Sequence, residues 1–366
     1  MKYYKLNDLC TDIVDCPHTT PDWKNEGIRV VRNFNLKDGN LDFTDGYFVD
    51  EATYLERTKR AIPEEGDIII SREAPMGVVG IVPKGLKCCL GQRLVLLKVN
   101  KGKCDPYYLL NTLMSDFVQT QFKRADATGS IVSNLCIPDL KEIIIPVIES
   151  GQEDVARLLE IINKKQLINN AINDNLEQQI QLIFDYLFPD VCAGNKHMGD
   201  FIIPKRGKSL LSKNVVHGNV PVIAGGLEPS IYHNVANTIA PVVTISSSGA
   251  NAGFVNIWGV PVWSSDSSYI DSEMSRYVYF WYAYLKRHQN NIYNIQTGSA
   301  QPHIYPSHIS SLPITDLDYK KIENYTEIVS PIFSTITKNH VENQHLQSLR
   351  DWLLPMLMNG QATIND

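Results

Sequence analysis

Two long stretches of the chain place apolar residues at the spacing of an amphipathic helix. In the first, Ser150 and Glu153 form a capping-box pair, and apolar residues then recur three, four or seven positions apart through Leu187. They are Ile161, Ile168, Ile172, Leu176, Ile180, Ile183 and Leu187. The second stretch begins near Thr315 and Asp318 and is predicted to end at Pro355. At about 1.5 Å per residue, each helix would be roughly 50 to 55 Å long.

A helix of this length with a single apolar stripe needs a partner that covers the stripe. We therefore predict that the two helices pair with each other, antiparallel if the halves of the chain are related by a pseudo-two-fold axis. Alternatively, each helix packs on the core of its own domain. Polar residues interrupt the stripes at Asn169, Asn170, Asn173 and Asn339.

Short strands dominate the region before each long helix. Alternating or continuous apolar runs appear in "GIRVV", "GDIIIS", "RLVLLKV" and "EIIIPV", and later in "VPVIAGG", "APVVTISSS" and "AGFVNI". Each region also contains one helical stretch, residues 106–124 and 275–289, that ends close to basic residues. The pattern predicts an α+β fold with two mixed domains.

The two halves of the chain repeat one another. A shift of 166 to 169 residues aligns the "TGS" segments, the strand ends "IIIP" and "SLPI", and the helical segments "EQQIQLIFDYLFP" and "NQHLQSLRDWLLP". Two copies at so long a period indicate a duplicated module, because a solenoid needs more and shorter repeats. The predicted division is 1–150 for the first domain, 151–190 for the first long helix, 191–316 for the second domain and 317–366 for the second helix.

The distribution of charge matters more than its sum. The chain has 366 residues and a net charge of −6. Residues 1–150 carry 19 basic and 21 acidic side chains and residues 191–324 carry 10 and 8, so these regions together are neutral and the long helices hold the deficit. No apolar run reaches the ~18 residues that cross a bilayer, and the start lacks a secretion segment, which predicts a cytoplasmic protein.

Motifs for catalysis are absent or incomplete. "GDFIIPKRGKS" ends like a phosphate-binding loop, but seven residues separate Gly199 from Gly207 where the loop requires four. The sequence has no metal-ligand quartet, no dinucleotide fingerprint and no adenine-methylation motif. We predict that the chain is not an enzyme and binds no metal; a nucleotide-hydrolysing enzyme that uses residues 207–209 is one alternative.

Polar loops with basic residues occupy corresponding places in both modules. The first loops are "CPHTTPDW" and "PKRGKSLL", the middle loops "SREAPMG" and "SSSGANAG", and the last loops "KRADATGSIVSN" and "QTGSAQPH". Glycine lets the backbone approach phosphates, hydroxyls and lysine bind them, and Arg, Gln, Asn or His can read base edges. Different loops on similar frames suit two different DNA sequences. The alternatives are ordinary solvated loops and a coiled-coil adaptor that binds only proteins.

These features together resemble the specificity subunits of type I restriction-modification systems. The resemblance rests on "DCPHTTPDW", "GDIIISREAPMGVVGIV" and "TGSIVSNL" in the first half and on "PKRGKSL", "GNVPVIAGG" and "TGSAQPHI" in the second. It implies two target-recognition domains that each read one part of a bipartite DNA site, with the two helices as an antiparallel coiled coil between them. It further implies two modification subunits that bind S-adenosylmethionine and methylate adenine, restriction subunits that use ATP and Mg, and no cofactor on this chain.

Loop and loop-edge residues with suitable side chains are the candidate DNA contacts. In the first module they are Arg72, Arg93, Lys123, Arg124, Thr128, Ser130 and Asn134. In the second they are Lys205, Arg206, Lys208, Ser246, Asn251, Arg287, Gln301 and His303.

Overall fold

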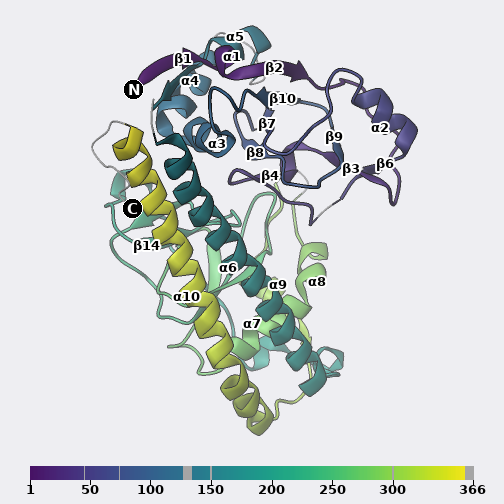
Figure 1. The fold of residues 1–366 in the computed structure, drawn as a ribbon. Helices are drawn as coiled ribbons and strands as arrows, with labels where there is room; N and C mark the ends of the chain where they lie inside the picture. Colours follow the sequence, from purple (N-terminus) through teal and green to yellow (C-terminus); the bar gives the residue numbers. More distant parts are fainter. Residues whose placement is uncertain (45, 74, 127–133, 149–150, 299–300, 359–366) are drawn as a thin grey trace. The chain divides into compact units, whose positions relative to one another are not determined.

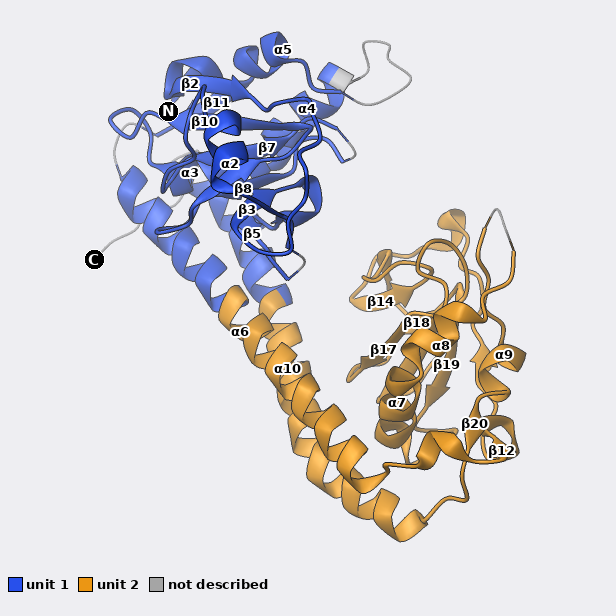
Figure 2. Cartoon of the chain, turned by 90° about the vertical axis from the view of Figure 1, so that its right-hand side faces the viewer, with its two compact units in different colours: residues 1–166, 344–366 blue, residues 167–343 orange. Residues whose placement is uncertain are grey.

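The chain forms two compact units that share both long helices. The computed structural model describes residues 1–44, 46–73, 75–126, 134–148, 151–298 and 301–358 (Figure 1). Unit 1 comprises Met1–Gln166 and Gln344–Asp366, and unit 2 comprises Leu167–Asn343 (Figure 2). Helices α6 (Gln152–Leu187) and α10 (Tyr319–Met358) therefore each contribute one part to each unit.

Unit 1 is built on a four-stranded antiparallel sheet in the order β2-β10-β7-β8. A second sheet, β6-β3-β9, contains the parallel pair β3–β9, and β1 pairs with β11 and β4 with β5. The strands are β1 (Lys2–Lys5), β2 (Cys10–Asp15), β3 (Ile28–Val31), β4 (Leu36–Lys37), β5 (Asn40–Leu41), β6 (Phe48–Val49), β7 (Ile68–Ser71), β8 (Val79–Ile81), β9 (Cys88–Leu90), β10 (Leu94–Val99) and β11 (Ile144–Val147).

Unit 2 repeats this topology except for the β4–β5 pair, which has no counterpart among the described strands of unit 2. Its sheets are β13-β19-β16-β17, β15-β14-β18 with the parallel pair β14–β18, and β12-β20. The strands are β12 (Lys196–His197), β13 (Lys205–Arg206), β14 (Val220–Ile223), β15 (Ile231–His233), β16 (Val242–Ser246), β17 (Val255–Trp258), β18 (Trp263–Ser264), β19 (Ser267–Asp271) and β20 (Pro313–Ile314). The duplication inferred from the sequence is thus a duplication of fold.

One of the shorter helices in each unit also occupies a corresponding place. In unit 1 the hydroxyl of Tyr108, in the helix after β10, donates to the Pro146 carbonyl of β11 at 3.1 Å. In unit 2 the hydroxyl of Tyr284, in the helix after β19, donates to the Pro313 carbonyl of β20 at 2.8 Å. The helices are α1 (Leu6–Leu9), α2 (Glu51–Arg57), α3 (Pro106–Met114), α4 (Asp116–Asp126) and α5 (Ile137–Glu142) in unit 1, and α7 (Val278–Arg287), α8 (Gln289–Asn294) and α9 (Pro306–Ser310) in unit 2.

The parts of α6 and α10 within each unit lie side by side and antiparallel (Figure 2). In unit 2 the rings of Phe184 and Tyr325 meet at 5.6 Å, and Asn339 Nδ2 donates to Asn173 Oδ1 at 2.7 Å. In unit 1 Leu159 and Leu354 belong to one buried core. The prediction that the two long helices pair is confirmed, and the alternative that each packs only on its own domain is wrong.

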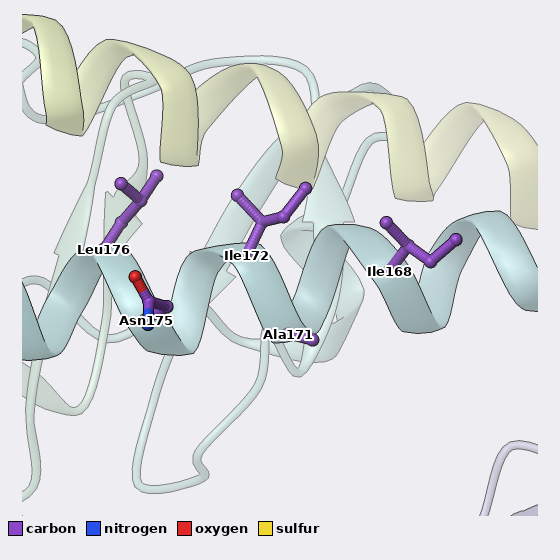
Figure 3. Close-up of a pocket in the computed structure, with 5 residues that line it drawn as sticks. All are labelled: Ile168, Ala171, Ile172, Asn175 and Leu176. Carbon is purple, nitrogen blue, oxygen red and sulfur yellow. The ribbon is translucent and has the colours of Figure 1, made fainter.

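The predicted face of the pairing, however, is wrong in the middle of α6. Ile161, Ile168 and Ile172 are 57%, 55% and 43% exposed, whereas Asn169 and Asn173 are 1% and 4% exposed. The asparagines are buried because amides bond across the helix pair: Asn169 Nδ2 donates to Glu342 Oε2 at 2.7 Å and to Asn343 Oδ1 at 2.9 Å. Ile161 in unit 1, and Ile168 and Ile172 in unit 2, which Figure 3 draws, therefore keep large exposed surfaces.

The start of α10 agrees with the sequence and its end does not. Asp318 accepts hydrogen bonds from the N–H groups of Lys320 and Lys321 at 3.1 and 3.2 Å, as an N-cap residue does. The helix continues past Pro355 to Met358. A proline in the final turn removes one hydrogen bond and leaves the rest of the ladder intact, so it does not end the helix.

Candidate nucleic-acid interface

Three loops of unit 1 meet at one edge of its main sheet. Strand β10 is antiparallel to both neighbours, with Val95 opposite Asp15 at the end of β2 and Leu94 opposite Ser71 at the end of β7. The loops that follow β2 and β7 therefore lie beside the loop that precedes β10. The last loop joins them, because the N–H of Leu135 donates to the Arg72 carbonyl at 3.0 Å. We call this set of loops the unit 1 loop edge.

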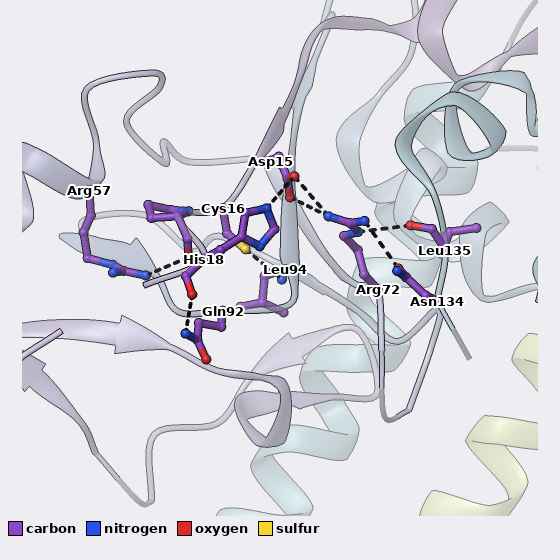
Figure 4. A network of polar contacts seen from close by, with 10 residues as sticks. Asp15, Cys16, His18, Arg57, Arg72, Gln92, Leu94, Asn134 and Leu135 are labelled. Atoms are coloured by element: carbon purple, nitrogen blue, oxygen red, sulfur yellow. Dashed lines mark hydrogen bonds and ion pairs between the residues drawn. The ribbon is translucent and has the colours of Figure 1, made fainter. Parts of the chain in front are cut away.

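Arg72 ties this loop edge together (Figure 4). Its guanidinium donates to both carboxylate oxygens of Asp15 at 2.9 and 3.0 Å, to the Leu135 carbonyl at 3.1 Å and to Asn134 Oδ1 at 3.3 Å. Only 12% of the side chain is exposed. The two candidates Arg72 and Asn134 thus lie together. The Arg72 guanidinium, however, donates to Asn134 and to other groups of unit 1.

Two residues that the sequence analysis did not select also hold the loops in place (Figure 4). Arg57, 8% exposed, donates to the Leu90, Thr19 and Pro17 carbonyls at 3.0, 3.0 and 3.3 Å. Gln92 donates to the His18 carbonyl at 2.5 Å and to Thr20 Oγ1 at 3.1 Å. Both lie far in sequence from the loop that they fix, so no local pattern could have identified them.

A cluster of aromatic rings around Arg32 was also missed. The Arg32 guanidinium lies 4.4 Å from the centre of the Tyr47 ring, 5.1 Å from Phe34 and 5.5 Å from Trp23. Trp23 and Phe34 are 38% and 41% exposed. Cation–π contacts of this kind hold an arginine at the surface in a fixed orientation. In the sequence, the mixture of basic and aromatic residues in segment 23–47 could have indicated this cluster.

The remaining described candidates of unit 1 are exposed. Arg93 has φ of 66°, a left-handed conformation rare outside glycine, and its 57% exposed side chain lies 3.2 Å from the Glu73 carboxylate. Lys123 and Arg124 are exposed in the last turn of α4. Thr128 and Ser130 lie outside the described residues.

Unit 2 has a corresponding loop edge. Ser246 at the end of β16 lies opposite Ser267 of β19, and Arg206 of β13 lies opposite Ser268. The last loop reaches the same place, because His303 forms a bridge with Ser248. Asp266 links the loops: Arg206 pairs with it at 2.6 Å, and the Ser248 hydroxyl also donates to it.

The candidates of unit 2 divide into exposed and buried side chains. Ser246 is 3% exposed and donates to the Ala224 carbonyl at 3.3 Å. Arg287 donates to the Phe188 and Pro189 carbonyls at 2.8 and 2.7 Å, just after the end of α6. The others are exposed or half-buried: Lys205, Arg206, Lys208, Asn251, Gln301 and His303.

The basic ends of α4 and α7 thus differ in what they can contact. Lys286 lies 5.0 Å from the centre of the Phe254 ring, and burial lowers its pKa while the Glu177 carboxylate opposes that shift. Its neighbour Arg287 bonds to unit 2 itself. The corresponding Lys123 and Arg124 of unit 1 are exposed.

The segment Gly207–Ser209 is not arranged as a phosphate-binding loop. The Gly207 N–H donates to the Ser267 carbonyl at 2.8 Å and the Lys208 N–H to the Ser264 carbonyl at 2.9 Å. A phosphate loop presents such N–H groups to the ligand, so this segment lacks the required donors. The nucleotide-hydrolysing alternative is therefore not supported.

The described residues contain neither a metal-binding cluster nor a helix that could cross a membrane. In that part of the chain, no group of three or more His, Cys, Asp or Glu side chains is placed to hold a metal ion. No helix there combines the length and hydropathy that a membrane crossing requires.

Comparison with known proteins identifies the family of the first module. Residues 1–178 match the family described as "Type I restriction modification DNA specificity domain". The putative type I restriction enzyme MjaX specificity subunit of Methanocaldococcus jannaschii is 27% identical over 135 residues, which span 37% of this chain and 30% of that protein. The crystal structure of the type I restriction-modification S subunit from M. genitalium matches with a TM-score of 0.54 and 18% identity, covering 96% of this chain and 94% of the other. That likeness concerns the fold. The first module, residues 1–178, thus belongs to the type I restriction-modification DNA specificity domain family, and the second module repeats its main sheet topology.

Proposed function

We propose that the chain is the DNA-recognition subunit of a type I restriction-modification complex, with one part of a bipartite site read by each unit. The observation that carries the proposal is the repeated loop edge: one topology occurs twice, and each copy gathers three loops of different sequence at the same edge of the same sheet. Direct readout requires side chains held in fixed positions near base edges. The Arg72–Asp15 and Arg206–Asp266 pairs supply that fixation.

We propose further that the chemistry belongs to partner chains. Modification subunits with S-adenosylmethionine would methylate adenine, and restriction subunits would use ATP and Mg, in the cytoplasm where the DNA lies. This chain would bind no cofactor and catalyse no step. Family membership supports this division, as does the charge distribution, because the acidic helices repel DNA phosphates while the neutral modules do not.

The exposed side of α6 is the proposed docking surface for the modification subunit. Ile168 and Ile172 line a shallow apolar groove in unit 2 together with Ala171, Asn175 and Leu176 (Figure 3). Large exposed apolar side chains in one row are typical of protein contact surfaces. Their place on an acidic helix makes a protein, rather than DNA, the suitable occupant.

Replacing both Lys205 and Lys208 by alanine is expected to weaken DNA binding by the assembled complex to a similar extent on all sequences. Both side chains are exposed at the unit 2 loop edge and are suited to phosphates. If each contacts one phosphate, the slope of log K against log salt falls by about 2. Titration of labelled duplexes at several salt concentrations measures the slope. An unchanged slope would show that these lysines do not contact DNA, and Lys59→Ala, an exposed lysine of α2's C-terminal end, is the matched control.

A further inference from the structure

The loop that follows β3 also reaches the unit 1 loop edge. Asn33 Nδ2 donates to the Glu73 carbonyl, in the loop after β7, at 2.6 Å. The Gly91 N–H, in the loop before β10, donates to the Val31 carbonyl at 2.7 Å. Arg32 lies between these two attachments in the chain, so its backbone is fixed beside the loops to which we assign DNA recognition.

Three aromatic rings hold the Arg32 side chain in this place. The guanidinium carbon lies 4.4, 5.1 and 5.5 Å from the centres of the Tyr47, Phe34 and Trp23 rings. Trp23 itself belongs to the loop after β2, and its ring meets the Tyr47 ring edge to face with the centres 4.8 Å apart. These contacts restrict the orientation of the guanidinium but give its N–H groups no oxygen or nitrogen acceptor.

The donors of Arg32 are available to an external acceptor. In the part of the chain that the structure describes, its guanidinium takes part in no hydrogen bond and no ion pair. The clamp residue Arg72 differs, because it donates to Asp15 and Asn134. A half-buried guanidinium with a fixed orientation and free donors is suited to a planar partner that offers two acceptors side by side.

Unit 2 has no arginine in the corresponding loop. The loop after β14 also packs on its loop edge: the Ser246 hydroxyl donates to the Ala224 carbonyl at 3.3 Å, and a Cβ added at Gly225 would lie 2.5 Å from the Ser248 carbonyl oxygen. Its sequence begins "AGGL" where unit 1 has "RNFN". Both parts of a site offer the same phosphates, whereas their bases differ. A guanidinium that only one module places there is therefore better suited to a base than to a phosphate.

We propose that Arg32 reads a guanine in the part of the DNA site that unit 1 recognises. Guanine presents the acceptors O6 and N7 at its major-groove edge, and a guanidinium can donate to both at once. Trp23, Phe34 and Tyr47 are positioning residues that set the direction of these donors. The inference rests on the proposed function and deepens it, because it names one base and the side chain that reads it.

The test measures binding of DNA duplexes by the complex of the full chain with its modification subunits. Methylation mapping of the wild-type complex defines the site, and each guanine of the site is then replaced in turn by 7-deazaguanine, which pairs normally but lacks N7. We expect one replacement to weaken the wild-type complex about 10-fold and to leave binding by the Arg32→Ala complex unchanged. On the unmodified site, Arg32→Ala should weaken binding about 10-fold to 100-fold.

Further variants separate reading of the base from charge and from folding. Arg32→Lys keeps the charge without the paired donors, so it should retain the affinity for unrelated duplexes and lose the dependence on that guanine. This variant decides if Arg32→Ala fails to fold. Trp23→Leu should weaken binding to the site about fivefold, and Trp23→Phe should restore it. Arg29→Ala is the matched control, because Arg29 lies over the Phe43 and Phe48 rings within β3, and the dependence on that guanine should persist.

Two results would overturn the inference. Dependence on the same guanine in the Arg32→Ala complex would show that another group reads it. A loss of affinity that is equal on all duplexes would assign Arg32 to a phosphate. A wild-type complex without any sequence preference would instead contradict the proposed function itself, whereas a sequence-specific complex whose site Arg32→Ala leaves unchanged would contradict this inference alone.

Discussion

Replacing Arg72 by alanine is expected to destabilise unit 1 by about 2 to 3 kcal/mol, far more than loss of a surface contact would. Arg72 holds Asp15, Asn134 and the Leu135 carbonyl at once, and its removal leaves the Asp15 carboxylate, 22% exposed, without its cation. The loops at this edge are then expected to open locally. Hydrogen exchange measured on peptides that contain Leu135 should accelerate, because its N–H donates to the Arg72 carbonyl in a loop no longer held.

Arg93→Ala is the matched control at the same loop edge. Its side chain is 57% exposed and pairs with Glu73 at 3.2 Å, so we expect a change in stability below about 0.5 kcal/mol. Arg72→Lys should resemble the alanine variant, because an ammonium cannot reproduce the fork of guanidinium donors. If Arg72→Ala kept full stability and slow exchange but lost DNA binding, Arg72 would be a direct DNA contact and its assignment as a loop clamp would be wrong.

Ile172→Asp, alone and combined with Ile168→Asp, is expected to weaken assembly with the modification subunit by about 100-fold. Both side chains lie in the groove on the exposed side of α6, and a buried carboxylate at the contact would lack a partner. Because the side chains are 55% and 43% exposed, the free chain should fold as before. Analytical ultracentrifugation of the mixed subunits measures the assembly.

Gln178→Asp provides the control for this prediction. It adds one negative charge to an exposed position of the same helix outside the groove, so assembly should persist. Equal loss in the control would point to a charge effect along the helix, and full assembly by the isoleucine variants would show that the modification subunit binds elsewhere.

The modules and the long helices could be predicted because apolar periodicity and internal duplication can both be seen in a single sequence. It did not predict which side of α6 faces α10. Periodicity identifies an apolar stripe but does not tell whether the same chain or a partner covers it. Here Asn169 donates to Glu342 and Asn173 accepts from Asn339, both on α10, while Ile168 and Ile172 are exposed.

The loops of the candidate site were likewise predictable, and the roles of their side chains were not. Arg72, Arg287 and Ser246 are of residue types that suit DNA contacts. Each nevertheless donates to an acceptor from a distant segment: Arg72 to Asp15, Arg287 to the Phe188 carbonyl and Ser246 to the Ala224 carbonyl. Lys205 and Lys208, by contrast, are exposed. Whether a basic side chain is available to contact DNA therefore depends on tertiary contacts, which cannot be read from composition.

Genome-wide mapping of adenine methylation, in a host that expresses this chain with its modification subunits, tests the two-module account most directly. The account predicts methylation at a sequence of two defined parts separated by an unspecified spacer. It also predicts that replacing Asn251 and Gln301 at the unit 2 loop edge changes only one part. Methylation without sequence preference, or a change in both parts when unit 2 alone is altered, would contradict it.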